Sequence, residues 1–164
     1  MKCLFFSFLI SVLFFSFWLI VPSEPQAGPA INNKEVKDER IALLEAFFQK
    51  YNSPLERESA NFVSVADRAG IPWKLLPSVS CVESSCGKHY PAGTFNIFGW
   101  ASGNHTFSSY SHAISLVAYK LTTLPYYRAW QAKKEDIGLL SKIYCPPNAK
   151  NWEAGVKKFM GEIK

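Results

Sequence analysis

The chain has 164 residues, of which 48% are hydrophobic and 15% aromatic, and its formal net charge is +5. This composition excludes a wholly disordered chain, because it supplies enough apolar side chains for a core. The excess positive charge lies in residues 81–164, which carry ten basic and five acidic residues. A basic half favours an anionic polymer such as a bacterial wall, a phospholipid surface or nucleic acid, although a solvated surface is the simpler explanation of charge alone.

Residues 1–30 are predicted to be a targeting segment and linker. Leu4 to Val21 is an apolar run of 18 residues without a charge, preceded by Lys2. This length is typical of a membrane anchor, whereas a cleaved signal peptide usually has a shorter core, and both export the rest of the chain. We therefore expect an N-terminal hydrophobic helix, acting as a signal peptide or membrane anchor. Residues 31–164 would then be one extracytoplasmic domain of the bacterial cell envelope, monomeric, and either membrane-anchored or secreted.

Apolar residues at helical spacing predict six helices after the linker. Ser53 before Pro54 predicts the start of the second helix, and Gly70 predicts its end. The predicted ranges are 34–51, 54–69, 73–85, a fourth helix that begins near Ser108, Ser109 or Ser111 and ends before Pro125, then 135–144 and 152–163.

Residues 88–106 show no helical or strand period, and a loop of this length in a small domain is usually functional. The predicted fold class is mainly α, with the helices bundled around one long irregular loop or small lobe.

Three of the four cysteines, Cys81, Cys86 and Cys145, would be exported, where one disulfide can form among them. Residues five apart lie on different faces of a continuous helix, so we expect Cys145 to pair with either Cys81 or Cys86. The spacing of cysteines and histidines matches no zinc site, and we expect no metal ion and no cofactor.

Glu83 is chemically isolated in the sequence, since no other Asp or Glu occurs from Ser84 through Lys134. It lies in the last turn of an apolar helix, where poor solvation and the negative end of the helix dipole both raise the pKa of a carboxyl group. A carboxylic acid that stays protonated near neutral pH is what a glycosidase needs to protonate a leaving oxygen. An exposed glutamate at a helix end would occupy the same position in the sequence.

The run LLPSVSCVESSCG at 75–87 resembles the catalytic helix of the lysozyme-like superfamily. Its nearest groups are the lytic transglycosylases and the bacterial mannosyl-glycoprotein endo-β-N-acetylglucosaminidase-like enzymes. The latter carry Asn-x-Phe-Gly after the glutamate, which NIFGW at 96–100 matches. In the same family a phenylalanine followed by Ser-Tyr leads into a helix, and FSSY at 107–110 is similar to that segment. A tyrosine near the end of the domain is also typical of the family, and Tyr144 matches it. The resemblance covers about residues 55–164.

The resemblance implies a lysozyme-like helical domain in which Glu83 is the general acid. Ser84 would orient the acid or contact the sugar, and the loop at Asn96 would form the floor of a cleft. Phe98 and Trp100 would lie against sugar faces, and Tyr144 would hydrogen-bond near the scissile linkage. The substrate-binding residues implied in this way are Ser84, Asn96, Phe98, Gly99, Trp100, Tyr110 and Tyr144.

Most glycosidases use two carboxylates, but the 88–106 loop supplies none, and only Glu135 or Asp136 remains as a distant candidate. One acid suffices for a lytic transglycosylase, in which the 6-hydroxyl of the sugar closes an anhydro ring, or for hydrolysis assisted by the substrate's N-acetyl group. The sequence therefore predicts cleavage of β-1,4 linkages between the amino sugars of peptidoglycan.

The sequence alone leaves three alternatives open. They are a two-acid hydrolase of the same fold, a non-catalytic wall-binding or assembly module, and a membrane-surface or nucleic-acid module. We expect peptidoglycan strands as the partner, with membrane contact through an uncleaved N-terminal segment. No nucleic-acid partner is expected, because the sequence contains no RNA- or DNA-binding motif.

Overall fold

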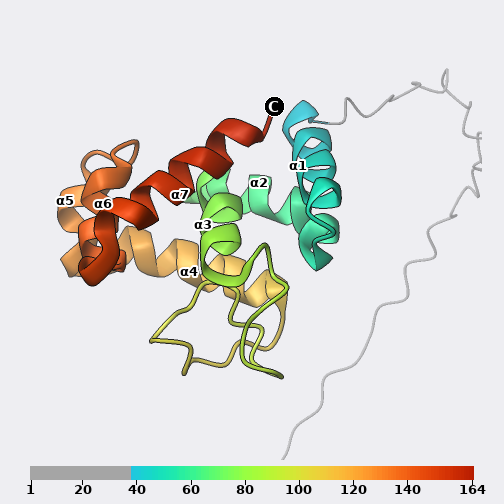
Figure 1. The fold of residues 1–164 in the computed structure, drawn as a ribbon. Helices are drawn as coiled ribbons and strands as arrows, with labels where there is room; N and C mark the ends of the chain where they lie inside the picture. The colour runs from blue at the N-terminus through green and yellow to red at the C-terminus, as the bar shows by residue number, and fades with distance from the viewer. Residues whose placement is uncertain (1–37) are drawn as a thin grey trace, which may run out of the picture. The chain divides into compact units, whose positions relative to one another are not determined.

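Helices make up all the regular structure in the part of the chain that the computed structural model describes, residues 38–164 (Figure 1). No strand occurs in this range, which confirms the mainly α prediction for these residues. None of the helices in this range is long and apolar enough to cross a membrane. The predicted hydrophobic helix and the rest of residues 1–30 lie outside the described residues.

All six predicted helices are present among the described residues, with boundaries that differ by a few residues, and residues 34–37 of the first predicted helix lie outside that range. Three short elements, η2 (Pro125–Tyr127), α5 (Arg128–Gln131) and η3 (Pro146–Asn148), were not predicted, because three or four residues are too few to show a helical period. The described elements are α1 (Glu39–Lys50), η1 (Pro54–Glu58), α2 (Ser59–Ala69), α3 (Leu75–Ser84), α4 (Tyr110–Thr123), η2 (Pro125–Tyr127), α5 (Arg128–Gln131), α6 (Ile137–Tyr144), η3 (Pro146–Asn148) and α7 (Ala149–Glu162).

The helix boundaries follow from local capping chemistry. The hydroxyl of Ser53 accepts a hydrogen bond from the backbone N–H of Leu55 and caps the start of the second predicted helix. This helix begins as the 3₁₀ turn η1, which leads directly into α2. Gly70 ends α2 with a left-handed φ of 58°. Among the three candidate serines, Ser109 caps α4 by accepting from the N–H of His112.

The helix that carries Glu83, α3, packs against α7 and α2. Every side chain from Leu75 to Cys81 is buried, which is typical of a helix covered on all sides. Pro77 is tolerated because it stands in the first turn, where its missing N–H would have no partner inside the helix. The apolar and small residues of α3 therefore fix its axis, and with it the position of its last turn.

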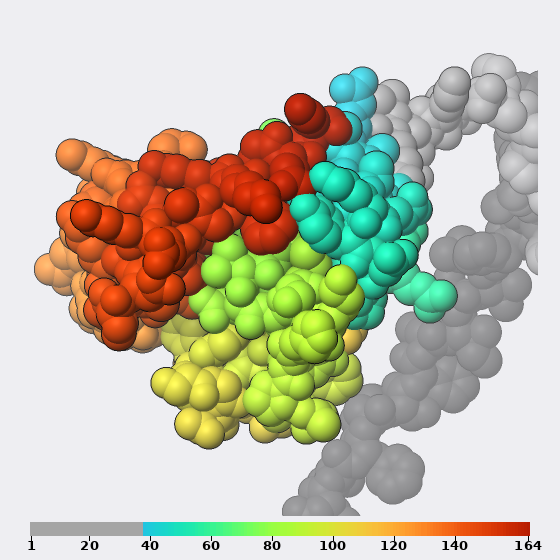
Figure 2. All heavy atoms as spheres, viewed as in Figure 1, coloured from blue at the N-terminus to red at the C-terminus, as the bar shows by residue number. Residues whose placement is uncertain are grey.

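Residues 85–109 form the long irregular loop that the sequence predicts, and they connect α3 to α4. Ile97, Phe98 and Phe107 are buried and fasten the loop to the core. Figure 2 shows the loop, in yellow-green and yellow, packed directly against the helices. The loop is thus a fixed wall of the domain.

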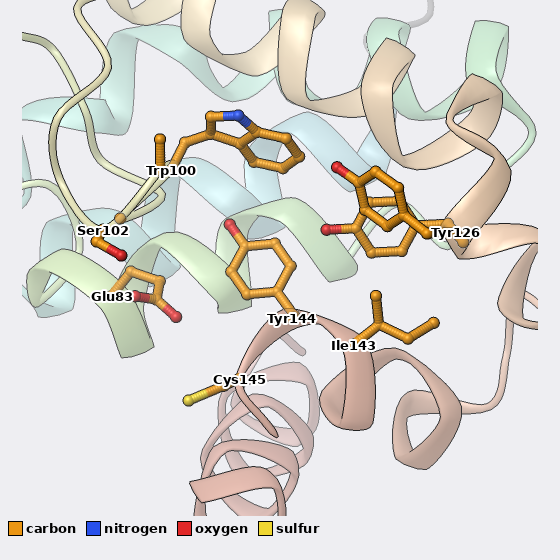
Figure 3. Close-up of a pocket in the computed structure, with 10 residues that line it drawn as sticks. Glu83, Trp100, Ser102, Tyr126, Ile143, Tyr144 and Cys145 are labelled. Atoms are coloured by element: carbon orange, nitrogen blue, oxygen red, sulfur yellow. The ribbon is translucent and has the colours of Figure 1, made fainter. Parts of the chain in front are cut away.

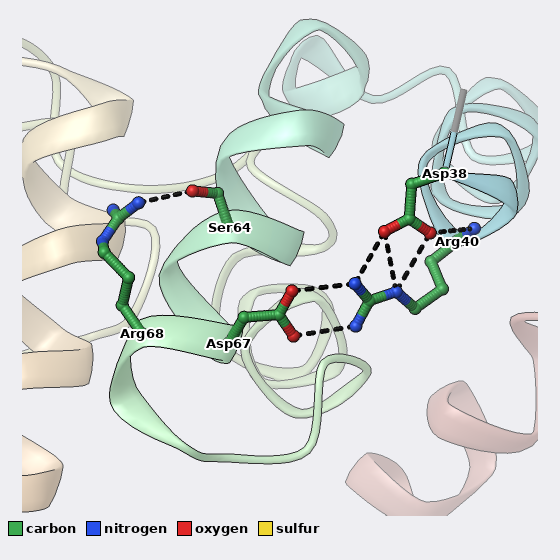
Figure 4. A network of polar contacts seen from close by, with 5 residues as sticks. All are labelled: Asp38, Arg40, Ser64, Asp67 and Arg68. Atoms are coloured by element: carbon green, nitrogen blue, oxygen red, sulfur yellow. Dashed lines mark hydrogen bonds and ion pairs between the residues drawn. The ribbon is translucent and has the colours of Figure 1, made fainter. Parts of the chain in front are cut away.

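A network of charges joins α1 to α2 (Figure 4). The guanidinium of Arg40 donates two hydrogen bonds of 2.8 Å to the carboxylate of Asp67 and others to Asp38, while Arg68 donates separately to Ser64. The hydrogen bonds from Arg40 lower the pKa of Asp67. The ionised Asp67 carboxylate therefore adds to the free energy of unfolding at pH values above its unfolded pKa. This contribution is lost as the pH falls through the lower pKa of the folded protein.

Candidate functional site

Glu83 lies in the last turn of α3 with its side chain partly buried. Its Oε1 accepts a hydrogen bond of 2.6 Å from the indole N–H of Trp152, a residue of α7 that is 3% exposed. Burial raises the pKa of Glu83 above its ordinary value, and the hydrogen bond from Trp152 opposes that shift. The structure thus has the raised pKa that the sequence predicts, with desolvation as its main cause.

A cavity of about 460 Å³ opens beside this carboxyl group (Figure 3). We call it the Glu83 cavity, and it is lined by Glu83, residues 99–102, Tyr126, Tyr127 and residues 143–145. Its volume falls within the usual range for small-molecule sites. Glu83 carries the only carboxylate among the described residues that line it.

Aromatic rings form much of the wall of the Glu83 cavity. The ring of Tyr144 stacks on Trp152, with centroids 5.0 Å apart, and meets the ring of Trp100 edge-on at 6.1 Å. The Nζ of Lys120 lies over the Trp100 ring, 5.5 Å from its centroid, and places a positive charge against this aromatic side chain. Burial raises the pKa of Tyr144 well above its ordinary value, so this phenol stays neutral.

The loop backbone at Gly99 passes directly over Glu83. A Cβ atom built on Gly99 would lie 2.5 Å from Oε2 of Glu83, and the φ of Gly99 is +60°. Only glycine satisfies both the left-handed conformation and the close approach. Because Trp152 binds the other carboxylate oxygen, the side chain of Glu83 is held between α7 and the loop.

Two buried polar side chains hold the loop in this position. The amide of Asn96 donates to the carbonyl oxygens of Trp100 and His105 and accepts from the N–H of Trp100 at 2.8 Å. The hydroxyl of Ser84 lies 2.9 Å from the carbonyl oxygen of Ile97 and accepts from a backbone N–H of the next turn. Both side chains are 1% exposed, so they support the floor of the Glu83 cavity without reaching a ligand.

Four of the predicted site residues line the Glu83 cavity: Glu83, Gly99, Trp100 and Tyr144. The hydroxyl of Tyr144 donates to the carbonyl oxygen of Phe98 at 2.7 Å, so it anchors the loop while the ring lines the cavity.

Two other predicted contacts need correction. The side chain of Phe98 is fully buried, so it packs in the core instead of lying against a sugar. Tyr110 lies elsewhere, with its hydroxyl 2.8 Å from that of Tyr90 and its ring against Phe95. Both corrections have the same cause, since the sequence does not reveal which face of a loop or helix end turns inward.

The sequence did not single out several lining residues, among them Ser102, Tyr126, Tyr127 and Cys145. It also missed Trp152 as the partner of Glu83. One local signal for a cavity residue was Tyr126, directly after Pro125, because a surface turn leaves side chains in water. Ser102 lies in the loop that follows α3, whereas Cys145 and Trp152 are distant in the chain and come near α3 through the packing of α6 and α7.

The two acids considered as a second carboxylate do not line the Glu83 cavity. Asp136 instead caps α6 by accepting from the N–H of Leu139 at 3.1 Å, and Glu135 is exposed. Within residues 38–164, no group of three or more His, Cys, Asp or Glu side chains is placed to hold a metal ion.

Known proteins give no guide to this cavity. Comparison with family models, with curated proteins and with solved structures finds no match. What the chain does must therefore be inferred from the chemistry of the site and from the motif residues that it contains.

The disulfide joins Cys81 to Cys86, and the expected pairing with Cys145 is wrong. The expectation assumed a continuous helix, but α3 ends at Ser84, and Ser85 and Cys86 then take left-handed φ values of 52° and 59°. This turn brings Cys86 back to Cys81, and the disulfide closes a covalent ring of residues 81–86 that includes Glu83. Cys145 is a free thiol that lines the cavity.

Reduction of the disulfide is expected to lower the free energy of unfolding by about 2 kcal/mol, because the small ring restricts the unfolded chain. Urea denaturation with and without a phosphine reductant measures the change. The Cys145→Ser variant should respond to the reductant like the wild type, and a double Cys81→Ala/Cys86→Ala variant should not respond at all. Equal stability of the oxidised and reduced wild type would contradict the assignment.

Replacement of Asn96 by alanine is expected to lower the free energy of unfolding by about 3 kcal/mol, because buried backbone groups of the loop lose their partners. Chemical denaturation measures the loss. Asn104→Ala is the matched control, since Asn104 lies in the same loop with a more exposed side chain, and it should change stability by less than about 0.5 kcal/mol. Similar losses in both variants would show that Asn96 has no special role.

Proposed function

We propose that the chain cleaves the β-1,4 glycan backbone of peptidoglycan through a lysozyme-like domain, with Glu83 as a single general acid and base. The activity would be that of an endo-β-N-acetylglucosaminidase-like hydrolase or of a lytic transglycosylase. The observation that carries the proposal is a partly buried carboxyl group of raised pKa that faces a cavity with aromatic walls and no second carboxylate among its described lining residues.

The raised pKa of Glu83 supports the acid step. A carboxyl group that keeps its proton near neutral pH protonates the oxygen of the leaving sugar, and the glycosidic bond then breaks. The resulting carboxylate is stabilised by the hydrogen bond from Trp152, whose N–H donates to Oε1. The carboxylate then accepts a proton from the sugar's 6-hydroxyl in the transglycosylase route, or from the water that opens the intermediate in the assisted route.

The nucleophile is supplied by the substrate in both routes that need one acid. In the transglycosylase route the 6-hydroxyl of the sugar attacks, Glu83 takes its proton, and a 1,6-anhydro ring forms. In the assisted route the carbonyl oxygen of the N-acetyl group attacks first, and water then opens the intermediate. Both routes agree with a cavity in which Glu83 carries the only carboxylate among the described lining residues.

Product analysis tests the proposal. The full-length chain, purified in a mild detergent, is incubated with purified peptidoglycan, and the soluble products are identified by mass spectrometry, with Glu83→Gln alongside. Anhydro-muropeptides that are absent with the variant support the transglycosylase, and reducing-end fragments, heavier by one water, support hydrolysis. Full activity of Glu83→Gln overturns the role of Glu83. Binding without products from either protein identifies a non-catalytic wall-binding module instead.

A further inference from the structure

Two large hydrophobic side chains stand out as exposed among the described residues, Tyr119 at 62% and Tyr126 at 56%. Tyr126 lines the Glu83 cavity, whereas Tyr119 lies on α4 beside a separate depression next to α2. An aromatic ring left in water at the edge of a cavity offers apolar area that a ligand can cover. The two tyrosines therefore have similar exposure but different surroundings.

Tyr126 is held in place by its neighbours. It belongs to η2, which begins at Pro125, and the amide of Gln131 fastens the preceding turn by donating to the carbonyl oxygens of Leu121 and Leu124 at 3.0 Å. The ring of Tyr127, 4% exposed, supports that of Tyr126 with centroids 4.5 Å apart. A ring fixed in this way loses little conformational entropy when a ligand covers it.

Tyr126 and Glu83 lie at different places along the wall of the Glu83 cavity. In Figure 3 the ring of Tyr144 lies between Glu83 and Tyr126. A ligand that reaches both residues therefore passes over Tyr144, with the loop backbone of residues 99–102 forming part of the same wall. This arrangement suits an extended chain of rings better than a single compact molecule.

We propose that Tyr126 is a specificity-determining residue on which one sugar ring of the glycan strand stacks while the bond to be cut lies at Glu83. The faces of a β-linked amino sugar are formed by C–H groups, which pack on an aromatic ring, and its hydroxyl groups point outward to water. This inference rests on the proposed function and adds a substrate class to it, namely long glycan strands. Tyr126 contributes to binding alone, so it acts on KM and leaves kcat unchanged.

The binding test uses full-length Glu83→Gln as the parent, which does not turn the ligand over. Titration calorimetry measures its affinity for peptide-free peptidoglycan glycan strands. Adding Tyr126→Ala should weaken binding about tenfold, equivalent to about 1.4 kcal/mol. Tyr126→Phe and Tyr126→Trp keep an aromatic face and should stay within about twofold of the parent. Tyr119→Ala, a tyrosine of similar exposure outside the cavity, should leave the affinity unchanged.

The kinetic test uses the chain with Glu83 intact. Tyr126→Ala should raise KM for glycan strands about tenfold while kcat stays within about twofold. Circular dichroism melting checks that each variant is folded, and Tyr126→Phe should restore the wild-type KM.

If Tyr126→Ala binds glycan strands as tightly as the Glu83→Gln parent, the role of Tyr126 is overturned and the proposed function stays intact. The same conclusion follows if Tyr119→Ala weakens binding as much as Tyr126→Ala does. A fall in kcat with KM unchanged also overturns the role of Tyr126. A parent that does not bind glycan strands, together with a wild-type chain that does not cleave them, overturns the proposed function itself.

Discussion

Replacement of Glu83 by glutamine is expected to lower kcat for peptidoglycan cleavage by about 10³-fold or more, because an amide cannot donate the proton that the leaving oxygen needs. The amide oxygen can still accept the hydrogen bond from Trp152, so the cavity should keep its shape. Initial rates of release of soluble fragments from purified peptidoglycan measure the loss. The expected effect is on kcat and not on the affinity for the strands.

Glu135→Gln is the matched control for this substitution. It makes the same chemical change at an exposed position outside the Glu83 cavity, and it should leave the rate within about twofold. The opposite pattern, with Glu83→Gln active and Glu135→Gln inactive, would transfer the role of the acid to Glu135.

The pH dependence of the reaction follows from the raised pKa of Glu83. The acid step needs the protonated carboxyl group, so kcat/KM should fall as the pH rises through this pKa. Because the pKa is raised, this limb should lie above the pH at which an ordinary glutamate titrates. A rate that rises with pH across the same range would contradict Glu83 as the proton donor.

The same shift predicts how stability changes with pH. The pKa of Glu83 is higher in the folded protein than in the unfolded chain. Its protonation therefore contributes fully to the free energy of unfolding below the unfolded pKa, and this contribution is lost as the pH rises through the folded pKa. Glu83→Gln removes this loss and should melt at the same temperature as the wild type, or higher, at neutral pH. A folded but inactive variant would separate catalysis from stability.

Much of the helical fold could be predicted from the sequence, because periodicity and capping are local. Ser53, Gly70 and Ser109 act as caps through atoms only a few residues away. The disulfide could not be predicted in this way, since it depends on a left-handed turn at Ser85 and Cys86, and nothing in these two residue types requires such a turn. These residues are held in the turn by local contacts, since Cys86 is buried and bonded to Cys81 and the N–H groups of Lys88 and His89 donate to the carbonyl oxygen of Ser84.

Those site residues could be predicted that stand out in the sequence by their own residue type or by a motif. Glu83 stands alone in a long segment without acids, and Trp100 and Tyr144 belong to the motif residues. Trp152 and Tyr126 were missed, because their contact with the site arises only when α7 and η2 pack near the end of α3. The sequence thus predicts the reacting group better than the walls around it.

Gly99→Ala is expected to lower kcat/KM by about 100-fold, because its methyl group would occupy the space of the Glu83 carboxylate. The carboxylate cannot move aside easily, since Trp152 binds Oε1 while the new Cβ would lie 2.5 Å from Oε2. Either the carboxyl group or the loop must therefore shift, and both changes misplace the acid relative to the bond that is cut. Initial rates on peptidoglycan measure the effect.

Gly93→Ala separates this clash from simple backbone strain. Gly93 lies in the same loop with a φ of +76°, and a Cβ built there would have nothing within 4 Å. Gly93→Ala should lose about 1–2 kcal/mol of stability from the left-handed conformation, and Gly99→Ala should lose at least as much, as measured by urea denaturation. Only Gly99→Ala should also lose activity, since only its methyl group would meet Glu83. Equal activity of the two variants would mean that the position of Glu83 under the loop has no part in the reaction.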